Sequence, residues 1–309
     1  MAQISMQLVK ELRDRTQAGL NDCKSALTEA EGDMDKAVEI ILKKGLAKSA
    51  KRAGAVAAEG VVTTRVAADQ KSAVVVEVNI QTDFAARNED FLAFVDKVSE
   101  AAEKAKTGAD LLSEPMPGGT GTVEDNRAAL VGRLGENITV RRWERLSVDG
   151  PGLVASYVHM GGKIGVLLAV RADNDAVAQK ASSVIETTAM QIAAMAPPYL
   201  KSADVPEAAK KAQAEIFAAQ LAEEGKIPEE KRPQVIEGKV QKWVKEVCLL
   251  DQPSVVEPKL TVQDQLAAAA KEAGGSLEIV GFVRFERGEG IEVPQGADFA
   301  AEVAAMAKG

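Results

Sequence analysis

Histidine and cysteine are scarce in this 309-residue chain, and their scarcity argues against most enzyme classes. The one histidine is His159, so a catalytic triad or a histidine-based metal site would have to use it. The two cysteines, Cys23 and Cys248, are far apart and lack CxxC or Cys/His neighbours. That spacing excludes a disulfide framework and a zinc knuckle. We therefore expect no catalytic residue and no metal ligand, and we do not expect an enzyme.

Basic charge and long apolar runs are lacking too. The 38 Lys and Arg residues against 46 Asp and Glu residues give a net charge of −8. This disfavours a general electrostatic grip on DNA or RNA, because that grip grows with the phosphates that Lys and Arg neutralise. No apolar run reaches the roughly 18 residues of a membrane-spanning helix. We expect a cytoplasmic protein that binds neither DNA nor membranes.

Helical periodicity begins near the amino terminus. Residues 4–45 predict three short helices with a small core of their own, in which Ser5 and Asp33 are N-caps and Gly45 ends the last helix. The Ala- and Gly-rich stretch that follows has no apolar face and is typical of a connector. We place the first domain, a three-helix module with its linker, at residues 1–56.

Strand patterns take over after this boundary and occur twice. In each case two β-branched runs separated by a turn are followed by a helical pattern, which suggests a diverged internal duplication. The expected fold class is α+β, with two subdomains that are each a three-stranded antiparallel sheet backed by helices. The segments concerned are 60–66, 72–79, 88–105 and a third strand at 136–143, and then 153–159, 163–170, 175–196 and a third strand at 276–285.

An inserted segment of different character interrupts the second unit at about 198–247. Two amphipathic helices, 205–224 and 229–247, predict an antiparallel helical hairpin. A hairpin of this kind buries little by itself, so we expect it to pack on a partner. The remaining boundaries are a core N-subdomain at 57–146, a core C-subdomain at 147–288 that holds the insert, and a C-terminal module with a short helix at 289–309.

The segment 81–87, QTDFAAR, stands between a buried strand and a helix and is the most informative short stretch. Thr82 or Asp83 is a sound N-cap. Two interpretations of Phe84 remain open at this stage. It either packs on its own helix as a hydrophobic staple or projects as a wedge for another protein.

Other candidate sites are weaker. His159 lies at a predicted hairpin turn, where it is a docking residue, a base or a residue without a role. No Ser, Cys or Asp lies at a spacing that would form a nucleophile site with it. The Gly-rich pieces at 117–122, 161–165 and 288–292 do not match the phosphate-binding loop patterns, so we expect no nucleotide site.

Six ordered motifs resemble those of the bacterial elongation factor Ts family, and they extend from residue 8 to 306. They are LVKELRDRTQAGLNDCKSALTEAEGDMDKAVEIILKKG, VNIQTDFAARNEDF, GENITVRR, SYVHMGGKIGVLLAV, GFVRFERGEGIE and DFAAEVAAM. The first resembles that family's ubiquitin-associated-like module. The resemblance implies a guanine-nucleotide exchange factor that binds elongation factor Tu with GDP, dislodges Mg²⁺ and promotes replacement of GDP by GTP. Such a protein needs no cofactor of its own, because GDP, GTP and Mg²⁺ belong to its partner.

The resemblance also implies roles for particular residues. Thr82, Asp83, Phe84 and Ala85 match the segment that dislodges Mg²⁺, with Phe84 as a wedge between helices of the GTPase domain. Ala85 replaces the family's valine, which removes one or two CH₂ groups from the edge of the wedge. The positions that match partner-binding residues are Arg13, Leu20, Asn21, His159, Phe299 and Met306.

The sequence departs from the family pattern at one of these positions, and the resemblance has further implications for assembly and function. Some relatives carry methionine where this chain has Asn21, which weakens an apolar contact there. The helical hairpin resembles the family's coiled-coil subdomain, which is implicated in self-association, so we expect a homodimer through it. The alternative function is a non-catalytic binding or chaperone-like module that uses the N-terminal helices. A third hypothesis, an enzyme built on His159, predicts a pH-dependent reaction.

Overall fold

The computed structural model describes residues 4–16 and 18–292. The chain folds into two compact units. The first unit contains the residues up to Val62, Val76–Arg142 and the described residues from Glu286, and the second contains Thr63–Val75 and Trp143–Phe285.

The chain begins with three helices, α1 (Met6–Thr16), α2 (Leu20–Glu29) and α3 (Met34–Arg52). The predicted caps are confirmed, since the Ser5 hydroxyl accepts from the Leu8 N–H at 3.2 Å and Asp33 accepts from the Lys36 N–H at 3.0 Å. The three helices enclose their own core, made of Val9, Leu12, Cys23, Ala26, Leu27, Ala30, Ala37 and Ile41.

The prediction that the third helix ends at Gly45 is wrong, because α3 continues to Arg52. Its later half packs against α6 (Val123–Leu134), a helix that the sequence analysis missed. Gly45 lies so near α6 that a Cβ atom there would be 3.3 Å from the Ala128 carbonyl oxygen. The buried Ser49 hydroxyl, one turn later, accepts from Arg127 at 2.9 Å. Gly45 thus acts as a packing residue and not as a helix stop.

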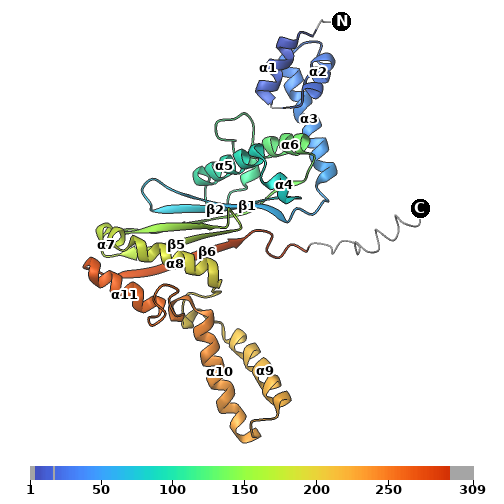
Figure 1. The fold of residues 1–309 in the computed structure, drawn as a ribbon. Coiled ribbons are helices and arrows are strands. Elements are labelled where there is room, and N and C mark those ends of the chain that lie inside the picture. Colours follow the sequence, from blue (N-terminus) through green and yellow to red (C-terminus); the bar gives the residue numbers. More distant parts are fainter. Residues whose placement is uncertain (1–3, 17, 293–309) are drawn as a thin grey trace, which may run out of the picture. The chain divides into compact units, whose positions relative to one another are not determined.

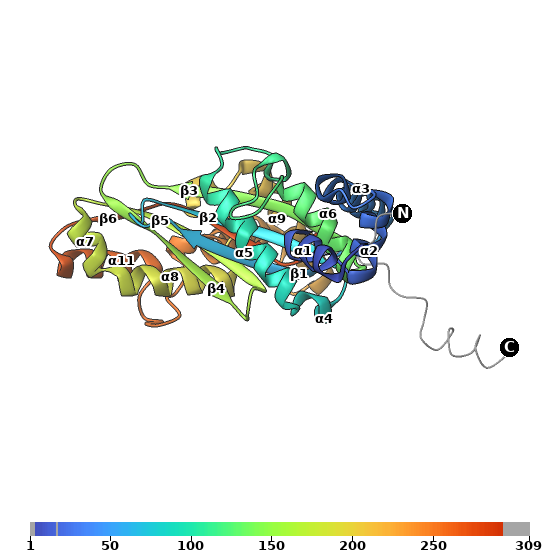
Figure 2. The same cartoon turned by 90° about the horizontal axis from the view of Figure 1, so that it is seen from above.

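The first sheet has the strand order β1 (Glu59–Val66), β2 (Ser72–Ile80) and β3 (Ile138–Ser147). Two longer helices, α5 (Glu89–Lys104) and α6, lie over one face of it, and the four-residue helix α4 (Asp83–Ala86) follows β2 (Figures 1 and 2). Every residue of β2 after Ser72 is buried, as its β-branched run predicts.

The second sheet has the order β4 (Gly152–His159), β5 (Ile164–Ala172) and β6 (Leu277–Glu286). Strands β4 and β5 form an antiparallel hairpin from the pair Gly152 and Arg171 to the pair His159 and Ile164. The helix predicted at 175–196 is two helices, α7 (Asp175–Lys180) and α8 (Ser182–Met195), which pack on this sheet with α11 (Val262–Ala273).

Helices α9 (Glu207–Glu224) and α10 (Arg232–Val247) lie side by side as a hairpin (Figure 1). Between them the Lys239 ammonium lies 5.5 Å from the centre of the Phe217 ring. The short 3-10 turns are Leu111–Ser113, Ser202–Asp204, Glu229–Lys231 and Leu249–Asp251.

A mixed α+β fold with N-terminal helices and two three-stranded antiparallel sheets is confirmed. The internal duplication, the coiled coil and the domain boundaries stay predictions. The C-terminal helix expected after residue 294 lies outside the described residues. Over the described ranges, every helix is too short or too polar to cross a membrane.

We expect Gly45→Leu to lower the free energy of unfolding by about 1–3 kcal/mol, because the added side chain has to displace the backbone of α6. Chemical denaturation followed by circular dichroism measures this change. The matched control is Gly238→Leu in α10, where a Cβ atom meets nothing within 4 Å. That variant gains about 0.5–1 kcal/mol from helix propensity. Equal stability changes in the two variants would contradict the packing role of Gly45.

Candidate functional site

The segment after β2 presents an aromatic side chain at the surface. Thr82 caps α4 by accepting the Ala85 N–H at 3.2 Å, as predicted. Phe84, the second residue of this helix, is 82% exposed. A ring that packed as a staple on its own helix would be largely covered, so the staple interpretation is excluded. Phe84 is therefore a large apolar side chain that its own fold leaves uncovered and available to a partner.

Both ends of this short segment are held by hydrogen bonds. Before α4, the Glu136 carboxylate accepts from the Thr82 N–H at 3.0 Å and from the Thr82 hydroxyl at 2.8 Å. After α4, the Asn88 side chain caps α5 by accepting from the Asp90 N–H at 2.9 Å. Across the exposed face, Asp83 and Arg87 form an ion pair at 3.1 Å. Phe84 thus projects from a loop whose backbone is fixed on both sides.

The predicted residues Arg13 and Leu20 lie together in the N-terminal module. Both line one surface hollow, which also includes Asp90 of α5 and Arg133 of α6. Leu20 is 45% exposed and therefore free to contact another protein. Asn21, the next residue, is also exposed but does not line this hollow. The hollow combines an apolar side chain with charges of both signs, as docking surfaces on proteins commonly do.

His159 lies in the second unit, at the end of the β4–β5 hairpin. Its Nδ1 is 2.8 Å from the Tyr157 hydroxyl, and the side chain is half-buried. Next to it, Met160 is 70% exposed at the hairpin tip. The Tyr157 hydroxyl thus holds the orientation of the imidazole ring.

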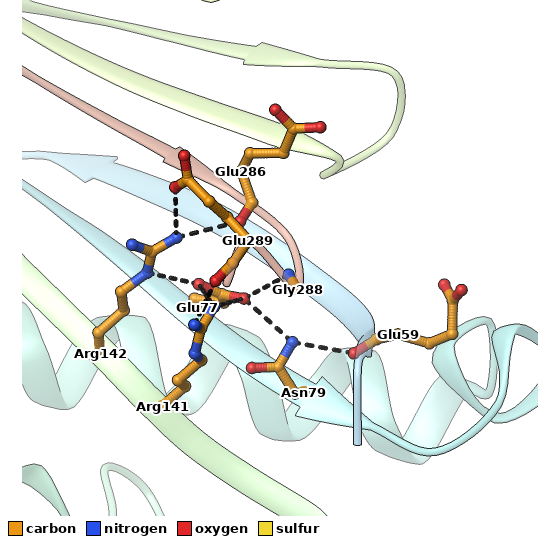
Figure 3. A network of polar contacts seen from close by, with 8 residues as sticks. All are labelled: Glu59, Glu77, Asn79, Arg141, Arg142, Glu286, Gly288 and Glu289. Atoms are coloured by element: carbon orange, nitrogen blue, oxygen red, sulfur yellow. Dashed lines mark hydrogen bonds and ion pairs between the residues drawn. The ribbon is translucent and has the colours of Figure 1, made fainter. Parts of the chain in front are cut away.

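A buried carboxylate organises the region from which the carboxyl-terminal segment departs (Figure 3). Glu77 in β2 has no exposed surface, yet it is surrounded by donors. Arg142 Nε lies 2.6 Å from one carboxylate oxygen, and Arg141 Nη1 lies 3.0 and 3.1 Å from the two. The Gly288 N–H and the Asn79 amide donate to Oε1 at 2.7 and 3.1 Å.

These donors hold residues 286–289 against the first sheet. Arg142 Nη2 also donates to the Glu286 carbonyl at 3.0 Å, and Arg141 donates to the Glu289 carbonyl. Gly288 has φ of +72°, and a Cβ atom there would lie 2.5 Å from the Ala58 carbonyl oxygen, so only glycine fits. The two remaining predicted residues, Phe299 and Met306, come later in the chain and lie outside the described residues.

Burial and hydrogen bonding act on the pKa of Glu77 in opposite directions. Burial raises the pKa, because it penalises the charged form, whereas the bonds from Gly288, Arg142, Asn79 and Arg141 lower it. The bonds prevail, and the pKa lies below the ordinary value of 4.5. Glu77 is thus an anion in the folded protein at neutral pH.

The two cysteines are buried, and the described residues contain no grouped metal ligands. Cys23 and Cys248 are buried, and burial raises the pKa of both thiols, which leaves them protonated and unreactive. Within residues 4–16 and 18–292, no three His, Cys, Asp or Glu residues are grouped so that they could hold a metal ion.

Comparison with known proteins shows to which family this chain belongs. Residues 81–289 match the model of the family described as elongation factor TS. The chain belongs to the elongation factor Ts family. Elongation factor Ts of a Nitratiruptor species is 47% identical over 99% of both chains. That of Clostridium perfringens is 47% identical over 98% of this chain and 99% of its own, and that of Clostridium kluyveri is 43% identical over 99% of both.

The membership in the elongation factor Ts family confirms the resemblance drawn from the six motifs. Two structurally important residues received no role from the sequence. Glu77 had a signal, because a charged residue inside the β-branched run VVVEVNI has to be compensated when the strand is buried. Glu136 lies in the motif GENITVRR, but the motif gave it no role, since its contact with Thr82 joins residues 54 positions apart.

We expect Glu77→Gln to lower the free energy of unfolding by about 3 kcal/mol or more at pH 7, because Arg141 and Arg142 keep their partly buried charges without the carboxylate. The pH dependence follows from the lowered pKa of Glu77. Its stabilising contribution is complete above the ordinary carboxyl pKa of 4.5 and is lost as the pH falls through the lower folded-state pKa. Denaturant titrations from pH 7 to pH 3 measure both effects.

The control for this change is Glu278→Gln, which removes an exposed ion pair with Arg171 at 2.9 Å. We expect it to cost less than about 1 kcal/mol, because water screens exposed pairs. The stability difference between wild type and Glu77→Gln narrows below pH 4.5. A difference that stays constant down to pH 3 would show that the Glu77 charge does not stabilise the fold.

Proposed function

We propose that this protein is a guanine-nucleotide exchange factor for elongation factor Tu in the cytoplasm. It binds elongation factor Tu with GDP, disturbs the Mg²⁺ site and promotes replacement of GDP by GTP. The observation that carries this proposal is the 82% exposure of Phe84 on a loop fixed at both ends. The family membership of the chain gives the partner class.

The hydrophobic free energy of an exposed phenylalanine ring is gained only when a partner buries the ring. Full burial of such a side chain is worth about 1.5–3 kcal/mol. Thr82, Asp83 and Ala85 surround the ring with a polar cap and a small residue, so a partner helix can approach it closely. Ala85 in place of the family's valine removes a little of this apolar surface, by less than about 1 kcal/mol.

Exchange needs no bond chemistry from this chain, because it is a coupling of two binding free energies. A protein that binds nucleotide-free elongation factor Tu more tightly than the GDP-bound form weakens GDP binding by the same factor. Each tenfold weakening corresponds to about 1.4 kcal/mol. Mg²⁺ joins the phosphates of the nucleotide to the GTPase, so a wedge that displaces its ligands loosens GDP. The exchange factor itself therefore acts without a cofactor.

Further contacts would spread the partner interface over the chain. Arg13 and Leu20 present the hollow on the N-terminal module, with Asn21 beside them. In the second unit, His159 offers an imidazole edge beside the exposed Met160. Phe299 and Met306 stay proposed contacts of the carboxyl-terminal module, and α9 and α10 stay the proposed homodimer contact.

We expect Phe84→Ala to reduce the acceleration of GDP release about tenfold or more, because the ring is the wedge that enters the GTPase domain. Stopped-flow release of a fluorescent GDP analogue from elongation factor Tu, with and without this protein, measures the rate. Wild type that fails to accelerate release would sink the proposal.

Val256→Ala is the matched control for Phe84→Ala, because Val256 is another exposed apolar side chain, 59% accessible in the segment before α11 and outside the proposed contacts. We expect this variant to accelerate GDP release from elongation factor Tu as much as the wild type does. Both variants keep the wild-type unfolding midpoint, since neither side chain is buried. An equal loss in both variants would point to a general surface effect and not to a wedge.

The alternative function, a binding or chaperone-like module in the N-terminal helices, has a different dependence on residues. The independent core of α1, α2 and α3 is the observation that favours it. In that case Phe84→Ala would leave partner binding unchanged, whereas substitution of Arg13 and Leu20 would abolish it. Phe84→Ala therefore separates the two functions, because only an exchange factor loses activity in this variant.

A further inference from the structure

The cap of α4 depends on the orientation of one hydroxyl group. A threonine hydroxyl has one hydrogen to donate and two lone pairs to accept with. Thr82 Oγ1 donates its hydrogen to Glu136 Oε1 at 2.8 Å, so its lone pairs are left to accept the Ala85 N–H at 3.2 Å. Glu136 Oε2 also accepts the Thr82 N–H at 3.0 Å. The carboxylate thereby fixes both polar groups of the capping residue.

Helix α4 needs such support because it has little of its own. Four residues are too few to form a stable helix in isolation, since the first turn costs more entropy than its hydrogen bonds return. Ala86 is the buried residue of α4, and Phe84 contributes almost no packing at 82% exposure. The direction of the Phe84 side chain is thus set by the backbone of α4, and the start of that backbone is set by Thr82.

The sequence places Glu136 opposite Thr82 through the end of α6. Gly135 adopts φ of +74° and its N–H bonds to the Val131 carbonyl at 2.9 Å, which ends α6 and turns the chain. The Asn137 N–H then donates to Gln81 Oε1 at 2.6 Å. Because β2 and β3 are neighbours in the sheet, residues 136–137 just before β3 meet residues 81–82 just after β2.

We infer that Glu136 is a positioning residue for Phe84, an inference that rests on the proposed exchange function. Its two hydrogen bonds hold Thr82 as a cap, and the cap holds α4 in the orientation that presents the Phe84 ring to the GTPase. Glu136 acts through Phe84 and does not have to contact the partner itself. Substitution of Glu136 keeps the Phe84 ring but loosens the α4 backbone that orients the ring.

The first test measures order in the loop without elongation factor Tu. In Glu136→Ala we expect the backbone amides of Thr82 and Ala85 to exchange with deuterium at least about fivefold faster than in wild type. Glu136→Gln keeps one acceptor oxygen, so its amides exchange at an intermediate rate. Glu272→Ala, at an exposed position of α11, is the control with wild-type exchange. Unchanged protection in Glu136→Ala would overturn the inference.

The second test asks whether Glu136 acts through the ring. A double-mutant cycle combines Glu136→Ala with Phe84→Ala. The quantity measured is the dissociation constant of each variant for nucleotide-free elongation factor Tu. This constant can be measured even when nucleotide exchange is slow. We expect Glu136→Ala to weaken binding about fivefold when Phe84 is present and less than twofold when it is absent. The maximal rate of GDP release from elongation factor Tu that Glu136→Ala produces falls by a similar factor. The unfolding midpoint of this variant stays that of the wild type.

The outcomes separate this inference from the proposed function. An equal loss of binding in both backgrounds, or wild-type GDP release by Glu136→Ala, would show that Glu136 does not position Phe84. Wild-type protein that leaves GDP release unchanged contradicts the exchange function. In that event faster amide exchange in Glu136→Ala would still establish that Glu136 orders α4, but the positioning of a wedge for exchange would be overturned.

Discussion

The buried carboxylate of Glu77 imposes the strongest constraint on the first unit. An ion without exposed surface has to be compensated by charge and hydrogen bonds, since its transfer from water costs several kcal/mol. Two consecutive arginines of β3 and a backbone N–H of residue 288 supply this compensation. One charge therefore fixes the pairing of β2 with β3 and the path of the chain after β6.

The rest of the first unit uses this fixed sheet as a platform. The end of β2 and the start of β3 bring Thr82 and Glu136 together, and the polar contacts there order a loop that carries an exposed ring. An ordered apolar side chain in water lowers solubility and gains nothing for the fold. Several hydrogen bonds that order the ring are an advantage when the ring binds another protein, because pre-organisation reduces the entropy lost on association.

Local signals predicted much of the secondary structure. The caps at Ser5, Asp33 and Thr82 hold as expected, and the β-branched runs become the strands of the two sheets. Helices α6 and α11 were missed, although each begins with a Thr-x-x-Asp capping box at Thr122 and Thr261. Gly45 misled the analysis because glycine serves equally as a helix stop and as a site of close helix packing, and sequence alone does not distinguish the two.

The family, the order of the strands and the candidate segment QTDFAAR could be inferred from the amino-acid sequence alone, because they depend on motifs and periodicities within short windows. The three-dimensional contacts were needed to show that Phe84 is exposed, that Glu136 holds Thr82 and that Glu77 holds Gly288 against the first sheet. The reason is physical. Exposure and compensation of charge depend on which distant residues the sheet brings together, and those contacts span tens to hundreds of positions along the chain.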